Sequence, residues 1–103
     1  MKLVLVTLTC ANESEAGKVA SALLDKKLAI CIKQIPVSSM YLWKGKKEKV
    51  SEIMLLMETY EGCIPHIEKE VNKLHSYDTP VLLVHPILYT TKKVKTWVKN
   101  ELL

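Results

Sequence analysis

The chain has 103 residues, of which 49% are hydrophobic. This length and composition suit one domain that buries a core without disulfides or metal ions as staples, and they exclude a second domain. No run approaches the roughly 18 uninterrupted apolar residues that a membrane span needs, and the apolar start lacks the cleavage pattern of a secretory signal. We therefore expect a single cytoplasmic domain over residues 1–103 with no membrane partner.

The charge balance and the cysteines narrow the function classes further. The formal net charge is +4, and all fifteen basic residues are lysine. Without arginine the chain has no planar guanidinium to grip phosphate or carboxylate, and surface lysines of this kind mostly serve solvation. Three cysteines, an odd number at wide spacings, make neither a disulfide framework nor a zinc knuckle. They are Cys10, Cys31 and Cys63.

The first elements are a strand and a helix. Residues 2–9 are apolar at first and then alternate, which predicts a central strand. Asn12 and Glu15, three positions apart, predict a helix start with Asn12 as the N-cap and the Glu15 carboxylate reaching back to it. The helix should end near Leu28. Its predicted apolar face consists of Ala16, Val19, Ala20, Leu23 and Leu24, whereas Glu15, Lys18, Asp25 and Lys26 lie outside that face.

A long β-hairpin is predicted from residues 28–43 and 50–60, which are rich in Ile, Val, Met and aromatic side chains. The tight turn lies at residues 43–46, where Gly45 permits a positive backbone angle. Because Pro36 has no amide proton, we expect a bulge there, or a stretch without a partner strand. The hairpin would then consist of two half-strands shifted relative to each other.

This hairpin is too long for its own domain. At about 3.3 Å per residue the first run would reach roughly 50 Å, whereas a compact chain of this length has a diameter of roughly 33 Å. A protruding two-stranded ribbon is marginal in water because its apolar faces and its edges stay exposed. We therefore expect it to be buried against other copies of the chain. The apolar residues near its tip are Met40, Tyr41, Leu42 and Trp43.

The remaining elements complete a recognisable order. Pro65 suits the first turn of a second helix that ends at about His75, and a turn over residues 76–80 leads into a strand over residues 81–87. Thr90 or Thr91 can cap a last helix. The order βαββαβ with an added helix predicts an α+β, ferredoxin-like plait with both main helices on one face of the sheet. The other face would be bare, which again points to self-association.

The plait hosts many unrelated activities, and most of them require residues that this chain lacks. An RNA-binding plait stacks bases on aromatics of its central strands, but residues 3–7 and 53–57 contain none. A phosphatase would need a guanidinium cradle, which a chain without arginine cannot form. A soft-metal chaperone would need a second cysteine near Cys10, and a nucleotide site would need a glycine-rich loop; the chain has neither. We expect no nucleic-acid partner, no organic cofactor and no enzymatic activity.

A small polar set remains at the ends of the predicted strands. Cys10 precedes the helix start at Asn12, where the helix dipole would favour a thiolate. His75 and Asp78 lie in the loop after the second helix. Thiolate, imidazole and carboxylate together would suit copper or zinc. The plainer alternatives stay open: Cys10 as a packed small residue, and His75 as a partner of the last helical carbonyls.

Several motifs stand out along the chain. They are Tyr41-Leu42-Trp43-Lys44-Gly45-Lys46 with Glu48, Leu74-His75-Ser76-Tyr77-Asp78-Thr79-Pro80, the opening from Cys10 to Ala16, and the late Trp97. Together they resemble the CutA divalent-cation-tolerance family. The resemblance covers nearly the whole chain in order. It implies a tight homotrimer similar in shape to the PII signalling proteins, a role in tolerance to copper and other divalent metal ions in the cytoplasm, and no established enzymatic reaction.

The resemblance also implies a metal site. The family's proposed contacts are a cysteine at the position of Cys10, a histidine at the position of His75, and a glutamate directly after the proline that matches Pro80. This chain has Val81 at that third position, and it has Ser76 where the family usually has proline. The expected ligands of Cu(II) or another divalent cation are therefore Cys10, His75 and, in place of the glutamate, Asp78.

A second expectation concerns a cleft between subunits. We expect Tyr41, Trp43, Lys46 and Tyr77 to line it, although large aromatics most often only fill an interface. The alternative functions are a PII-like signalling trimer that binds a small anionic metabolite in this cleft, and a structural trimer that acts as a scaffold. The tight hairpin turn and the lack of arginine argue against the anionic metabolite.

Overall fold

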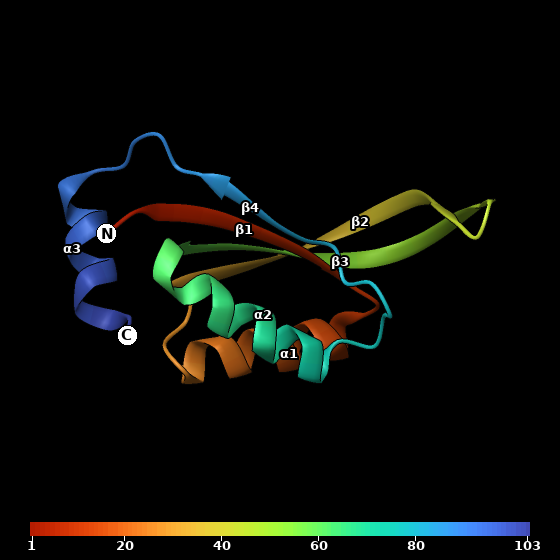
Figure 1. The fold of residues 1–103 in the computed structure, drawn as a ribbon, viewed down its shortest axis with the longest axis horizontal. Coiled ribbons are helices and arrows are strands. Elements are labelled where there is room, and N and C mark those ends of the chain that lie inside the picture. Colours follow the sequence, from red (N-terminus) through yellow and green to blue (C-terminus); the bar gives the residue numbers. More distant parts are fainter.

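The computed structural model describes residues 1–103 and confirms the α+β plait. Four antiparallel strands form one sheet in the order β2-β3-β1-β4. Helices α1 and α2 both lie on one face of it, and α3 lies beside the end near the N-terminus (Figure 1). The elements are β1 (Leu3–Cys10), α1 (Glu13–Asp25), β2 (Cys31–Trp43), β3 (Lys46–Tyr60), a 3-10 turn (Glu61–Cys63), α2 (Ile64–Leu74), β4 (Leu82–Pro86) and α3 (Lys92–Glu101). None of the three helices is long and apolar enough to span a membrane.

The core lies between the sheet and the two main helices. Burial alternates along β1, as expected for a strand covered on one face. The predicted apolar face of α1 and the apolar side of α2 meet these strand residues, except that Leu24 is 45% exposed and Leu74 is 39% exposed. The buried cluster includes Val6, Leu8, Val19, Leu23, Leu55, Met57, Ile67 and Val71.

Helix α1 ends three residues before the predicted end at Leu28. Lys27 adopts the left-handed conformation with φ of 58°. The amide of Lys27 donates to the carbonyl of Leu24, and the amide of Leu28 donates to that of Leu23. These are the two hydrogen bonds of a Schellman motif, with lysine at the position that glycine usually occupies. The chain therefore leaves the helix at Asp25 and turns toward β2.

The hairpin has an unbroken register, so the bulge predicted at Pro36 is wrong. Each residue of β2 pairs with β3 from Cys31 opposite Glu58 to the turn, and Pro36 pairs with Ile53. Lys44 and Gly45 have φ of 51° and 79°, the signature of a two-residue type I′ turn. Counting from this turn, Pro36 occupies a non-hydrogen-bonded pair, where its nitrogen faces the free edge of the sheet. The proline therefore costs the β2–β3 ladder no hydrogen bond.

The hairpin protrudes beyond the helical layer, as predicted (Figure 1). The molecule measures 45 × 26 × 22 Å, and Met40 and Leu42 near the hairpin tip are 70% and 75% exposed. The sheet face opposite α1 and α2 is also largely apolar. Strand pairing places many half-buried or exposed apolar side chains on this open face, among them Leu5, Ile35, Met54, Leu56 and Leu83.

The C-terminal elements follow the prediction with shifted bounds. Strand β4 begins at Leu82, one residue later than predicted, and ends at Pro86. Of the two candidate caps, Thr91 is the N-cap of α3, because its side chain accepts a hydrogen bond from the Val94 amide. Val98 is buried while Trp97 remains 49% exposed, so only some of the apolar residues of α3 pack against the rest of the domain.

Candidate functional site

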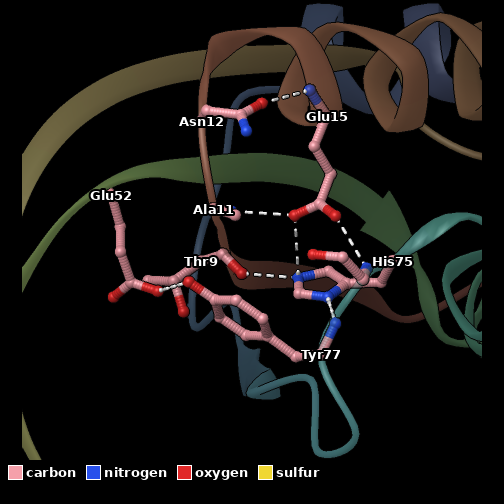
Figure 2. Close-up of polar contacts among 8 residues, drawn as sticks. Thr9, Ala11, Asn12, Glu15, Glu52, His75 and Tyr77 are labelled. Carbon is pink, nitrogen blue, oxygen red and sulfur yellow. Dashed lines mark hydrogen bonds and ion pairs between the residues drawn. The ribbon is translucent and has the colours of Figure 1, made fainter.

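Three segments meet at one place: the end of β1, the start of α1 and the loop after α2 (Figure 2). Asn12 caps α1 as predicted, since its Oδ1 accepts a hydrogen bond from the Glu15 amide at 2.9 Å. The Glu15 carboxylate, however, does not reach back to Asn12. It accepts hydrogen bonds from the amide of Ala11 at 2.8 Å and from that of Ser76 at 2.7 Å. Glu15 therefore joins the helix start to a loop 61 residues later.

The Glu15 carboxyl is charged in this setting. Burial alone would raise its pKa, but the hydrogen bonds from Ser76 and Ala11 and the neighbouring His75 outweigh burial and lower the pKa below 4.5. Only 10% of the side chain is exposed. The sequence pattern placed Glu15 outside the apolar face of α1, which the structure confirms, and the loop after α2 covers its side chain instead.

His75 lies between Glu15 and β1, and its side chain is fully buried. Its Nδ1 accepts a hydrogen bond from the Tyr77 amide at 3.1 Å, so Nε2 carries the proton and donates to the Thr9 carbonyl at 2.7 Å. Nε2 also lies 3.7 Å from Oε2 of Glu15. Both ring nitrogens are thus occupied, and the ring bonds to the Thr9 carbonyl of β1 rather than to the last carbonyls of α2.

Cys10 is fully buried at the end of β1. Burial above all, together with the carboxylates of Glu15 and Glu52, which repel a thiolate, raises the pKa of its thiol to about 12. The prediction that the helix dipole favours the thiolate is therefore wrong. Burial and two neighbouring negative charges outweigh the partial positive charge of one helix start.

Cys10, Glu15 and His75 form the cluster of potential metal ligands. One ligand atom from each residue lies within 4.8 Å of the other two. Two ligands at about 2.0–2.3 Å from a single Zn²⁺ lie at most about 4.6 Å apart, so a small contraction would let all three contact one ion. Sulfur, imidazole nitrogen and carboxylate oxygen suit a borderline divalent ion such as copper or zinc. The donor set therefore fits a divalent cation.

Two predicted ligands meet here, and the third does not. Cys10 and His75 converge, but Asp78 is exposed and lies outside the cluster, so its proposed substitution for the missing glutamate is not supported. Val81 is 51% exposed and also lies elsewhere. Glu15 supplies the carboxylate instead. The position of Glu15 in the N-cap motif, close to Cys10 in the sequence, is a sequence signal for a ligand here, but the contact of Glu15 with His75 depends on the tertiary fold.

A groove of about 680 Å³ lies next to this cluster, on the open face of the sheet. Tyr41, Trp43 and Tyr77 line it, as does Asp78, whereas Lys46 does not. The Tyr77 hydroxyl donates to Oε2 of Glu52 at 2.7 Å, across the space between the loop and β3 (Figure 2). Burial and this hydrogen bond raise the pKa of Tyr77, which therefore stays protonated.

Known proteins resemble the chain over nearly its full length. Residues 4–101 match the family model of the CutA1 divalent ion tolerance protein. The divalent-cation tolerance protein CutA of Archaeoglobus fulgidus is 32% identical over 93 residues, which cover 90% of this chain and 91% of that protein. Mouse protein CutA is 33% identical over 91 residues, which cover 87% of this chain. The chain spans about half the length of the mammalian relatives, 51% for the mouse protein.

Solved structures agree with this match. The structure of the periplasmic divalent cation tolerance protein CutA from Archaeoglobus fulgidus has a TM-score of 0.94 at 30% identity, covering 96% of this chain and 97% of that one. CutA1 from Oryza sativa has a TM-score of 0.96 at 28% identity, covering 100% of this chain and 95% of that one. With the fold, the hairpin motif and the family model in agreement, the chain belongs to the CutA1 divalent ion tolerance family.

Proposed function

We propose that this protein is a cytoplasmic, non-catalytic homotrimer that acts in tolerance to divalent metal ions and binds copper(II), or a similar ion, weakly at Cys10, Glu15 and His75. The observation that carries the proposal is the convergence of these three ligand atoms within 4.8 Å. Membership of a divalent ion tolerance family supports the general role.

The contacts around the three ligands are the reason to expect weak binding. A metal ion must displace the proton of the Cys10 thiol, whose pKa lies at about 12. It must also take a nitrogen of His75 from the Tyr77 amide or the Thr9 carbonyl. Each lost hydrogen bond subtracts from the metal–ligand interaction. Such a site would hold an ion only when the free metal concentration is high, which suits a response to metal excess.

Two exposed apolar surfaces support the homotrimer. The hairpin tip and the open face both leave large side chains in water, including Leu42 at 75% and Leu83 at 50% exposure. Contiguous apolar surface of this kind is typical of an interface between copies. The alternative of an anionic metabolite in the cleft loses support, because the groove residues include Glu52 and Asp78 and no basic side chain.

Removing two ligands should abolish copper binding. We expect isothermal titration of the wild-type protein with copper(II) to show saturable binding, and the double variant Cys10→Ala/His75→Ala to show none. The matched control is Cys31→Ala/His66→Ala, which removes another cysteine and an exposed histidine and should bind as the wild type does. Identical isotherms for the wild type and the first variant would contradict the metal site and leave the cluster a purely structural network.

Copper affinity should also rise with pH. The Cys10 pKa of about 12 means that the thiol keeps its proton throughout the neutral range, so binding through sulfur releases one proton. The apparent association constant should then increase about tenfold for each pH unit. The Cys10→Ala variant has no thiol proton to release, so titrations across the neutral range should show a shallower slope. Equal slopes would show that the sulfur is not a ligand.

A further inference from the structure

The groove beside the metal cluster has aromatic walls contributed by two separate segments. Tyr41 and Trp43 come from β2 near the hairpin tip, and Tyr77 comes from the loop after α2. Its volume of about 680 Å³ falls within the roughly 300–1,000 Å³ of small-molecule sites. Aromatic faces carry negative potential and attract cations. The Trp43 ring already attracts one, since the Lys44 ammonium lies 6.0 Å from its centroid.

The charges in the groove have one sign. Two carboxylates, Glu52 and Asp78, line it, and no lysine or histidine does. This contrasts with the whole chain, whose net charge is +4. None of the lysines around the hairpin tip is among the lining residues, although the Lys44 ammonium lies 6.0 Å from the centroid of the Trp43 ring. Two carboxylates against this one cation leave the groove net negative on a positive protein, which favours cationic ligands.

Glu52 is a buried carboxylate with an unused acceptor. The residue is 6% exposed. Its Oε2 is held by the Tyr77 hydroxyl at 2.7 Å, whereas Oε1 has no hydrogen-bond partner in the chain. The Tyr77 hydroxyl fixes the carboxylate in place, and the hydroxyls of Ser39 and Thr79 offer further acceptors in the groove. Because no buried side-chain oxygen of the chain lacks a hydrogen-bond partner, Oε1 is open to solvent, and an accessible carboxylate oxygen without a donor is a favourable partner for an N–H group.

We propose that this groove binds a small aliphatic ammonium ion, and specifically a diamine, with one ammonium on Glu52 against the aromatic walls and the other near Asp78. A metal ion is disfavoured because three ligand side chains converge only at Cys10, Glu15 and His75. A quaternary amine is disfavoured because it has no N–H to donate to Glu52. The proposal does not depend on the metal site. The groove lies on the open face, so in a trimer the ligand would enter between copies.

Titration of the native assembly with 1,4-diaminobutane tests the proposal. We expect saturable binding that weakens as salt is added. Butane-1,4-diol, which has the same length but no charge, and succinate, which is an anion, should bind at least tenfold more weakly. Tetramethylammonium, which lacks N–H donors, should also bind more weakly than the diamine. Absence of diamine binding, or equal binding of the diol, would overturn the proposal.

Two glutamates of β3 supply a matched pair of variants. Glu52→Gln keeps an oxygen that accepts from Tyr77 but removes the charge, and it should weaken diamine binding at least tenfold. Glu48→Gln makes the same change on the same strand outside the groove lining and should leave affinity unchanged. If the two variants weaken diamine binding equally, the binding comes from general surface charge, and the proposed site at Glu52 is wrong.

Discussion

The Glu15→Ala variant is expected to be less stable than the wild type by about 2–4 kcal/mol. The carboxylate accepts hydrogen bonds from the amides of Ala11 and Ser76 and lies beside the His75 ring. A hydrogen bond to a charged group contributes about 1.5–3 kcal/mol, and a buried donor left without a partner costs about 1–3 kcal/mol. Water can reach part of the vacated space, which keeps the loss below the sum of these values. Urea unfolding at one fixed protein concentration measures it.

Glu13→Ala is the control for Glu15→Ala. Glu13 belongs to the same first turn of α1 but is exposed, so its loss should cost at most about 1 kcal/mol through the helix dipole. The pH adds a second check. Because folding lowers the pKa of Glu15, its contribution is complete well above pH 4.5 and is lost as the pH falls through the lowered value. A stability difference that persists unchanged in strong acid would contradict the assigned role of the charge.

The Leu83→Glu variant is expected to dissociate the proposed homotrimer. Leu83 lies on the open face and is 50% exposed in the single chain. If other copies cover this face, an unpaired carboxylate there costs about 3–5 kcal/mol per chain, which weakens association by at least about 100-fold. Sedimentation velocity over a range of protein concentrations should show a large shift toward single subunits.

Leu24→Glu provides the comparison for Leu83→Glu. Leu24 has a similar exposure of 45% but lies on α1, on the opposite side of the sheet. This variant should keep the wild-type assembly state. If both variants assemble as the wild type does, the open face is not the interface, and a wild-type protein that sediments as a single subunit would contradict the homotrimer itself.

Local patterns predicted the elements well because their causes are local. Asn12 caps α1 through its own side chain, Gly45 permits the turn, and the apolar stripe of α2 contains the buried residues Ile67 and Val71. The helix end at Asp25, set by the left-handed Lys27, was missed for a local reason as well. A lysine in the left-handed conformation gives no sequence signal comparable to that of a glycine.

The errors at the site have tertiary causes. The sequence indicates that Cys10 and His75 are candidate ligands, but the pKa of Cys10 depends on burial and on Glu52 from another strand. The predicted contact of the Glu15 carboxylate with Asn12 is wrong because nothing in the helical pattern reveals the loop that bonds to Glu15 instead. Pro36 was misjudged because the effect of a missing amide depends on strand order and on the parity of the ladder, and both require the assembled sheet.

The outward-facing nitrogen of Pro36 has a consequence for strand addition. The outer side of β2 is a free backbone edge thirteen residues long, the kind of edge that can template further strands. An incoming strand finds no donor at Pro36 and loses a ladder hydrogen bond there. The edge is thereby divided into the stretches 31–35 and 37–43, and the first of them is shorter than the roughly six or seven residues that stack in a steric zipper.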